Sequence, residues 1–275
     1  MIDKSRLYLI TEVEKLRDQL NEAEYPEVYG FIDHLWTGGE LENISPYDIA
    51  GKLMELDSPK AFPRYIISFI EQLYMIEIKA GNADAMNDLG AHYYEANRGF
   101  AQDFEKAVNY YTMAAEHGSR VAQENLGFCY YYGRNMQPDY EKAFHCFALG
   151  AFDGHLISLY KIGDMYLNGY YVNRNPEEAF HIYMHCLQTM AEEAEQYVAG
   201  PVYLRLGKMF LNGTGTEVNV KNALVCLQKA ESFLFDMVLA GDIKYRKSLE
   251  AAVRYQAEAR KKLSEMLPDR EWIDE

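Results

Sequence analysis

Residues 103–107 read DFEKA, and the stretch recurs as DYEKA at 139–143, NPEEA at 175–179 and NVKNA at 219–223. The alanines that close these copies are spaced by 36, 36 and 44 residues, so the last interval contains an insertion. A recurring period of this length is typical of repeat solenoids, in which each repeat is a small supersecondary unit.

Each copy has the features of a helix start. Asp or Asn stands first, where its side chain can accept hydrogen bonds from the free N–H groups of the first turn. Acidic residues follow in the first turn of three copies, and Pro176 occupies the first helical position of the third. The copies therefore predict four helices that begin in register.

A second recurring pattern lies before each copy, where Leu-Gly or Ile-Gly is followed by an aromatic residue. The four occurrences are Leu89-Gly90 with Tyr93, Leu126-Gly127 with Tyr130, Ile162-Gly163 with Tyr166, and Leu206-Gly207 with Phe210. Large side chains at i and i+4 lie on one face of a helix. Glycine is costly inside a helix, so its recurrence predicts a close approach of a second helix. Each unit is predicted to be helix A, a Gly-containing turn, helix B and a second turn.

At these positions the chain resembles the Sel-one-like repeat family, which is related to the tetratricopeptide repeats. The first unit carries the pattern best, from Ala85 and Leu89-Gly90 to Asp103 and Lys106-Ala107. The later units depart from it, since Ile162 replaces Leu and Glu178 replaces Lys. The resemblance implies an all-α, right-handed α/α superhelical solenoid, with helix A lining the concave side where partners bind.

The expected organisation has three parts. Residues 1–82 form an N-terminal helical region, with helices near 3–23, from Pro26, from Ser45-Pro46 and over 63–80. The last of these helices is interpreted as part of a degenerate capping repeat, and the first two could instead form a separate functional module. Four repeats follow at about 83–118, 119–154, 155–198 and 199–240, and residues 241–275 form a capping helix and tail.

Two details concern the later helices. The third B helix is expected to run on through Glu192, Glu193 and Glu195 until Pro201 resets the chain. The capping helix, over about 243–267, is expected to bury Leu249, Val253, Leu263 and Leu267 and to expose Arg254, Arg260, Lys261 and Lys262.

The charge excludes two classes of partner. The chain has 27 Lys and Arg against 42 Asp and Glu, and its formal net charge is −15. This charge repels phosphate backbones and anionic membrane surfaces, so neither nucleic acid nor membrane is expected as a partner. Because residues 1–6 lead directly into acidic amphipathic sequence, a cytoplasmic location is expected.

The positions of the cysteines and histidines favour a packing role over a catalytic or metal-binding role. Cys146 and Cys226 lie at the same repeat position, and Cys186 lies in a column of small residues, so these cysteines are interpreted as core side chains. His181 and His185 have the i, i+4 spacing of two metal ligands, but no third ligand stands at an obvious offset. No catalytic residue, metal or cofactor is expected, and the protein is not expected to be an enzyme.

The candidate site is the outward face of the A helices. At 100° per residue, the positions one before the Leu and two, three and six after it should turn outward together. The partner-binding residues predicted on this face are Asp88, His92, Asn125, Phe128, Tyr132, Lys161, Met165, Arg205, Lys208 and Met209. Phe128, Tyr132 and Met165 form the expected centre, because aromatic and Met side chains are common in binding hot spots.

The predicted function is an interaction module, an adaptor or scaffold that binds a peptide or protein in the groove of the A helices. The alternative is a regulatory or antagonist protein that binds and inhibits one enzyme or toxin, and a metal-dependent or hydrolytic enzyme is less favoured. For the aromatic residues Phe128 and Tyr132, packing against neighbouring repeats is an alternative to binding.

Overall fold

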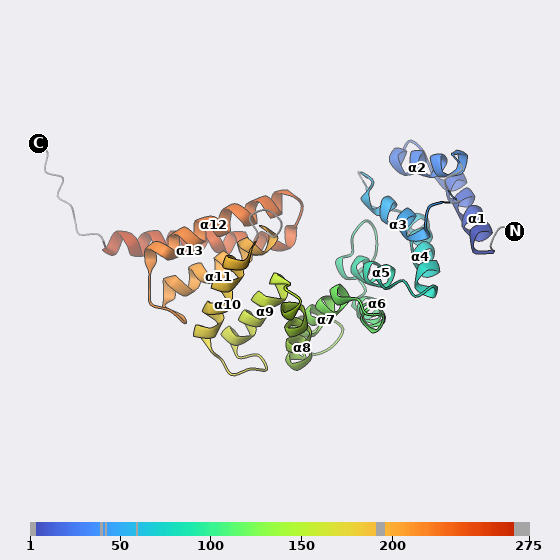
Figure 1. The fold of residues 1–275 in the computed structure, drawn as a ribbon. Coiled ribbons are helices and arrows are strands. Elements are labelled where there is room, and N and C mark those ends of the chain that lie inside the picture. The colour runs from blue at the N-terminus through green and yellow to red at the C-terminus, as the bar shows by residue number, and fades with distance from the viewer. Residues whose placement is uncertain (1–3, 39–40, 42, 59, 191–195, 267–275) are drawn as a thin grey trace, which may run out of the picture. The chain divides into compact units, whose positions relative to one another are not determined.

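The computed structural model describes residues 4–266 except 39–40, 42, 59 and 191–195. Within these residues the chain forms thirteen α-helices and no β-strand, which confirms the all-α prediction (Figure 1). The contacts divide the chain into two compact units, Met1–Asp139 and Tyr140–Glu275, and each is described by itself.

The first unit contains the N-terminal helices, the first repeat and helix A of the second repeat. Consecutive helices from α3 to α7 pack against one another, and α1 packs on α2 and α4. Ser45 caps α3 through its Oγ, which accepts a hydrogen bond from the backbone N–H of Asp48 at 3.0 Å. The helices are α1 (Lys4–Gln19), α2 (Pro26–Thr37), α3 (Pro46–Glu55), α4 (Arg64–Lys79), α5 (Ala83–Glu95), α6 (Phe104–Glu116) and α7 (Arg120–Tyr132).

The second unit continues the helix pairs. Each helix packs on the next along the chain, and α11 additionally contacts α9 and α13. A short 3-10 helix, Ile243–Tyr245, leads into the last helix. The helices are α8 (Tyr140–Phe152), α9 (Leu156–Asn168), α10 (Pro176–Thr189), α11 (Gln196–Asn212), α12 (Val220–Leu239) and α13 (Arg246–Met266).

All four B helices begin directly after the predicted cap residue, at Phe104, Tyr140, Pro176 and Val220, and three of them show the following cap hydrogen bond. A side-chain oxygen accepts a hydrogen bond from the backbone N–H three residues later in each case, as expected of an N-cap. The pairs are Asp103 with Lys106 at 3.0 Å, Asn175 with Glu178 at 3.1 Å, and Asn219 with Asn222 at 2.9 Å.

The helix-interior glycines mark close approaches of helix A and helix B, as predicted. A Cβ on Gly163 would lie 2.7 Å from a ring carbon of Tyr183 in α10, and a Cβ on Gly90 would lie 2.9 Å from the ring of Tyr111 in α6. At Gly207 the nearest atom is Cγ of Leu227, at 2.6 Å. Each of these B-helix residues lies four positions after the repeat alanine, so the pairing is a property of the repeat.

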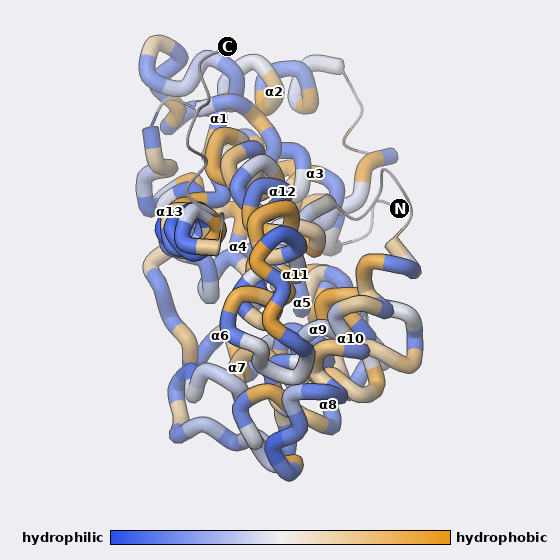
Figure 2. Tube along the Cα trace, turned by 90° about the vertical axis from the view of Figure 1, so that its left-hand side faces the viewer, coloured by the Kyte–Doolittle hydropathy of each residue, from blue (hydrophilic) through white to orange (hydrophobic). Residues whose placement is uncertain are grey.

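Hydrophobic residues recur in short groups along the helices and alternate with hydrophilic ones (Figure 2). This pattern suits helices with one buried face. Among the described residues, no helix is long and apolar enough to cross a membrane.

Two predictions for the later helices are wrong. Helix α10 ends at Thr189, because Met190 has left the helical backbone with ψ 118°. The third B helix therefore does not continue past Thr189 as predicted. Glu192, Glu193 and Glu195 lie outside the described residues. Pro201, expected to reset the chain, lies inside α11.

The capping helix exists as predicted, but its buried stripe differs. Ala252, Gln256 and Ala259 are buried, whereas Val253 is 49% exposed. The two alanines belong to the core beside α12, and the predicted Leu249 and Leu263 are half-buried against the same core. Leu267 lies outside the described residues.

Candidate functional site

Two of the predicted binding residues lie on α5, and both take part in contacts within the first unit. The carboxylate of Asp88 accepts a hydrogen bond from the Tyr47 hydroxyl of α3 at 2.7 Å. The His92 ring stacks on Phe100 with a centroid distance of 5.0 Å, and its Nε2 lies 3.0 Å from the Tyr74 hydroxyl. Burial lowers the pKa of His92, and a hydrogen bond with Asn97 partly offsets this effect.

Helix α7 carries the most exposed aromatic side chain among the predicted residues. Tyr132 is 49% exposed, and its ring stacks on that of Phe128 with centroids 6.3 Å apart. The guanidinium of Arg134 lies 5.6 Å from the centre of the Tyr132 ring. We call Phe128 and Tyr132 the α7 aromatic pair. Asn125, one turn earlier, donates a hydrogen bond to Asn87 of α5 at 3.0 Å.

Three predicted residues of the second unit are buried, which corrects their expected orientation. Met165 is 0% exposed, Met209 2% and Lys161 3%. An interior helix A has neighbours on more than one side, so its buried arc is wider than the single stripe assumed from the sequence. The position three after the Leu lies inside this arc, whereas the position six after it is exposed in all four A helices, at Glu95, Tyr132, Asn168 and Asn212.

Arg205 is committed to a polar network inside the second unit. Its Nε and Nη2 contact the two carboxylate oxygens of Asp164 at 2.5 and 2.7 Å. Asp164 also accepts hydrogen bonds from the Tyr183 hydroxyl at 2.7 Å and from Lys161 Nζ at 3.3 Å. Arg205 therefore connects α11 to α9 and is not available to a partner without breaking this pair.

The network shifts the titration of Asp164. Burial by itself raises the pKa of this carboxyl, but the Arg205 guanidinium, the Lys161 ammonium and the Tyr183 hydroxyl outweigh burial and lower the pKa to about 2. For Arg205, burial opposes the charge, and the Asp164 carboxylate raises its pKa well above the ordinary value. Both groups are thus charged at neutral pH and stabilise each other.

Lys208 is the predicted residue of the second unit that is exposed. Its Nζ lies 5.2 Å from the centre of the Tyr255 ring on α13, and the guanidinium of Arg254 lies 5.1 Å from the same ring. Tyr255 was missed because α13 lies outside the repeats, so no register connects it to Lys208. The sequence predicted that Arg254 is exposed, and this prediction was the signal that could have pointed to Tyr255 beside it.

The pKa values and the burial of the cysteine side chains are those expected of residues that pack inside the fold. Burial raises the pKa of Cys146 and of Cys226 to about 11, with Lys229 partly opposing the shift at Cys226. Cys129 and Cys186 are buried. In the part of the chain that the structure covers, no group of three His, Cys, Asp or Glu side chains is placed to hold a metal ion.

Consecutive packed helix pairs, three of them with a glycine contact between helix A and helix B, define an α-solenoid repeat protein. A profile of the Sel1 repeat matches residues 83–119, 120–155, 156–183 and 201–232. The chain belongs to the Sel1 repeat family.

Solved structures support the same fold. The Sel1 repeat protein from Oxalobacter formigenes superposes with a TM-score of 0.54 at 22% identity, over 79% of this chain and 84% of that one. A protective antigen present in uropathogenic Escherichia coli strains, which displays an SLR fold, gives a TM-score of 0.54 at 20% identity, over 79% of this chain and 45% of that one. No curated protein sequence matches the chain.

The family indicates a general role. Sel1 repeat proteins generally mediate protein–protein interactions, and the solenoid is typically a non-enzymatic interaction module.

Proposed function

We propose that this protein is an adaptor or scaffold that binds a peptide or another protein through the exposed positions of its A helices. Residues 83–240 would carry the interaction, and residues 1–82 and 241–275 would cover the ends of the repeats. A cytoplasmic location is part of the proposal, because the four cysteines are free, as is usual in a reducing compartment.

One observation carries the proposal. The α7 aromatic pair combines a Tyr side chain that is 49% exposed with a stacked Phe and a nearby guanidinium. Tyr, Phe and Arg supply large contact areas and are enriched where partners bind. A rigid stacked pair loses little side-chain freedom on binding.

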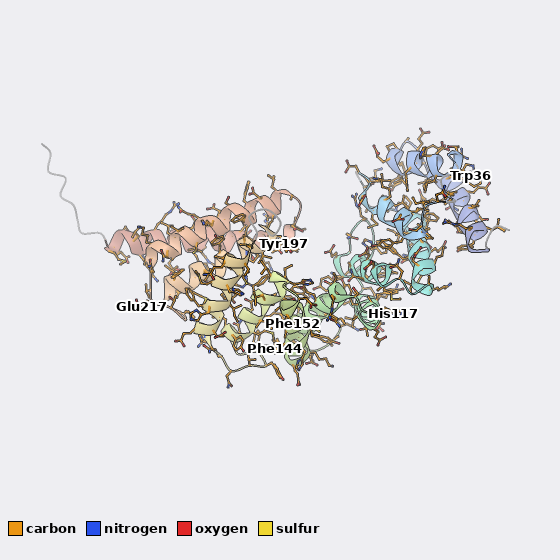
Figure 3. The ribbon with its side chains drawn as sticks, in the orientation of Figure 1. Trp36, His117, Phe144, Phe152, Tyr197 and Glu217 are labelled. Carbon is orange, nitrogen blue, oxygen red and sulfur yellow. The ribbon has the colours of Figure 1, made fainter. Side chains whose placement is uncertain are left out.

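Affinity purification with mass spectrometry tests the proposal, using Phe128→Ala with Tyr132→Ala. Leu149→Ala with Phe152→Ala is the matched control, because these side chains are 46% and 89% exposed on the B helix α8. Phe152 is labelled in Figure 3. The first variant is expected to lose partners that the wild type and the control retain. If the first variant stays folded and every partner remains bound, the α7 aromatic pair is not the binding surface.

The number of partners separates the two classes of function. A scaffold is expected to co-purify with several proteins, whereas an antagonist is expected to yield one partner in a one-to-one complex. Mass measurement of the purified complex gives the stoichiometry directly.

A further inference from the structure

The surface between α11 and α13 carries two exposed cations in a chain whose net charge is negative. Lys208 of α11 and Arg254 of α13 are exposed and converge on the ring of Tyr255, at 5.2 and 5.1 Å from its centre. Two cations beside one aromatic ring repel each other, so a negative group that contacts both would be favourable.

Carboxylates on the same helix are already engaged elsewhere. Glu250, one turn before Arg254, pairs with Arg246 at 3.4 Å, and Glu258, one turn after it, pairs with Lys262 at 3.3 Å. On α11, the positions three and four residues from Lys208 are Leu204, Arg205, Leu211 and Asn212, so no carboxylate stands beside it. Within the described residues, neither Lys208 nor Arg254 has a carboxylate within ion-pair distance.

A cavity lies where α11 and α13 meet the segment that leads into α12. Its lining mixes apolar side chains with Asn212, Lys262 and Glu265, and Glu265 pairs with Lys261 at 3.9 Å. The cavity has a volume of about 410 Å³, and its lining includes Leu211, one turn after Lys208, together with Val218 and Met266. Leu211 is buried, while Val218 and Met266 are 60% and 68% exposed at the rim. Lys262 connects the helices here, since its Nζ donates to the carbonyl oxygen of Leu211 at 3.4 Å.

We infer that the α11–α13 surface, formed by Lys208, Arg254, Tyr255 and the cavity at Leu211, Val218 and Met266, binds an acidic peptide segment of a partner protein. A Glu or Asp carboxylate of the segment contacts both Lys208 and Arg254, and a neighbouring aliphatic side chain enters the cavity. This inference rests on the proposed function and specifies the chemistry of the partner.

Charge complementarity selects a peptide over the other anionic partners. A net charge of −15 repels a polyphosphate chain or an anionic bilayer at long range. A short segment with a few carboxylates encounters mainly the local cations, because the Debye length at physiological salt is about 8 Å. The apolar side chains of the cavity, Leu211, Val218 and Met266, add a contact that a nucleic acid backbone cannot make.

Fluorescence anisotropy of a labelled peptide, acetyl-Gly-Glu-Leu-Glu-Glu-Leu-Gly, tests the inference with the full chain. The wild type is expected to bind this peptide and to bind the version with Gln in place of each Glu about tenfold more weakly. Lys208→Met with Arg254→Met is expected to weaken binding of the acidic peptide about fivefold to tenfold and to leave the Gln peptide unaffected. Raising the salt from about 50 mM to about 300 mM should weaken wild-type binding more than that of the variant.

A matched control removes the same charge elsewhere in the second unit. Lys229→Met with Arg260→Met changes two exposed cations outside the α11–α13 surface, and it is expected to bind the acidic peptide like the wild type. Equal binding of the acidic and Gln peptides, an equal loss in both double variants, or no binding of the acidic peptide by folded wild type would overturn the inference. Binding of phosphatidylserine vesicles through Lys208 and Arg254 without peptide binding would also overturn it.

The result is independent of the test on the α7 aromatic pair. If the Phe128 and Tyr132 variant loses its partners while the acidic peptide fails to bind, the proposed function stands and the inference about partner chemistry falls.

Discussion

Arg205 on α11 holds Asp164 on α9 in a two-point ion pair, with Nε and Nη2 at 2.5 and 2.7 Å from the two carboxylate oxygens. The side chain of Asp164 is 8% exposed and that of Arg205 is 24% exposed, so solvent screens the pair only weakly. Because α9 belongs to the third repeat and α11 to the fourth, the pair joins neighbouring repeats by a specific polar contact.

Breaking this pair should destabilise the second unit strongly. Arg205→Met leaves the buried Asp164 carboxylate without its main partner and is expected to cost about 3–5 kcal/mol of the free energy of unfolding. Arg246→Met is the matched control, because Arg246 and Glu250 form a pair whose side chains are 75% and 66% exposed. That change should cost less than about 1 kcal/mol. Urea denaturation of both variants measures the difference, and equal costs would contradict a stabilising role for the buried pair.

The same pair predicts a dependence of stability on pH. The pKa of Asp164 is about 2 in the folded chain, below its ordinary value of 3.8, so the unfolded chain holds this proton more tightly. The stabilisation is therefore complete above about pH 4 and is lost as the pH falls toward about 2, by roughly 2 kcal/mol in total. Denaturation curves at several pH values should show this loss in the wild type and in Asp236→Asn, an exposed control on α12. The loss should be absent from Asp164→Asn, and a variant that retained it would assign the dependence to another group.

The glycine contacts predict opposite effects of the same substitution at two positions. Gly163→Ala places a Cβ 2.7 Å from the Tyr183 ring and should destabilise the protein by about 1–3 kcal/mol. Gly30 lies in α2 with nothing within 4 Å of its Cβ position, so Gly30→Ala should stabilise by about 0.5–1 kcal/mol. Thermal unfolding gives the sign of both changes. A stabilising Gly163→Ala would show that α9 and α10 do not approach as closely as described.

The half-buried thiols of Cys146 and Cys226 should react slowly in the folded protein. With pKa values of about 11, Cys146 and Cys226 carry little thiolate at pH 8, so they should react more than about 50-fold more slowly with Ellman's reagent than glutathione does. In concentrated urea all four cysteines should react at the rate of a free thiol. Rapid reaction of Cys146 or Cys226 before unfolding would contradict their packing role.

The repeat made much of the fold predictable. The cap residues Asp103, Asn175 and Asn219 and the contact glycines Gly90, Gly163 and Gly207 recur at fixed positions, so each copy supports the interpretation of the others. These features are local or depend on one neighbouring helix. They follow from backbone hydrogen bonding and from the volume of a single Cβ.

The site was less predictable, because it depends on several neighbours at once. Met165 and Met209 were predicted to point outward, because the helical angle was measured from one buried residue only. Contacts with neighbours on other sides bury both side chains. Asp164 and Arg205 occupy different positions of the repeat, so comparing like positions did not pair them. Charges of opposite sign at different positions of adjacent repeats were the signal that could have identified the pair.

Site-specific photocrosslinking tests the binding role of the A helices most directly. A benzoylphenylalanine in place of Tyr132 should give a covalent adduct with a partner protein in cells, and the same group in place of Leu149, which is similarly exposed on α8, should give none. No adduct from position 132, or the same adduct from both positions, would contradict partner binding at the α7 aromatic pair.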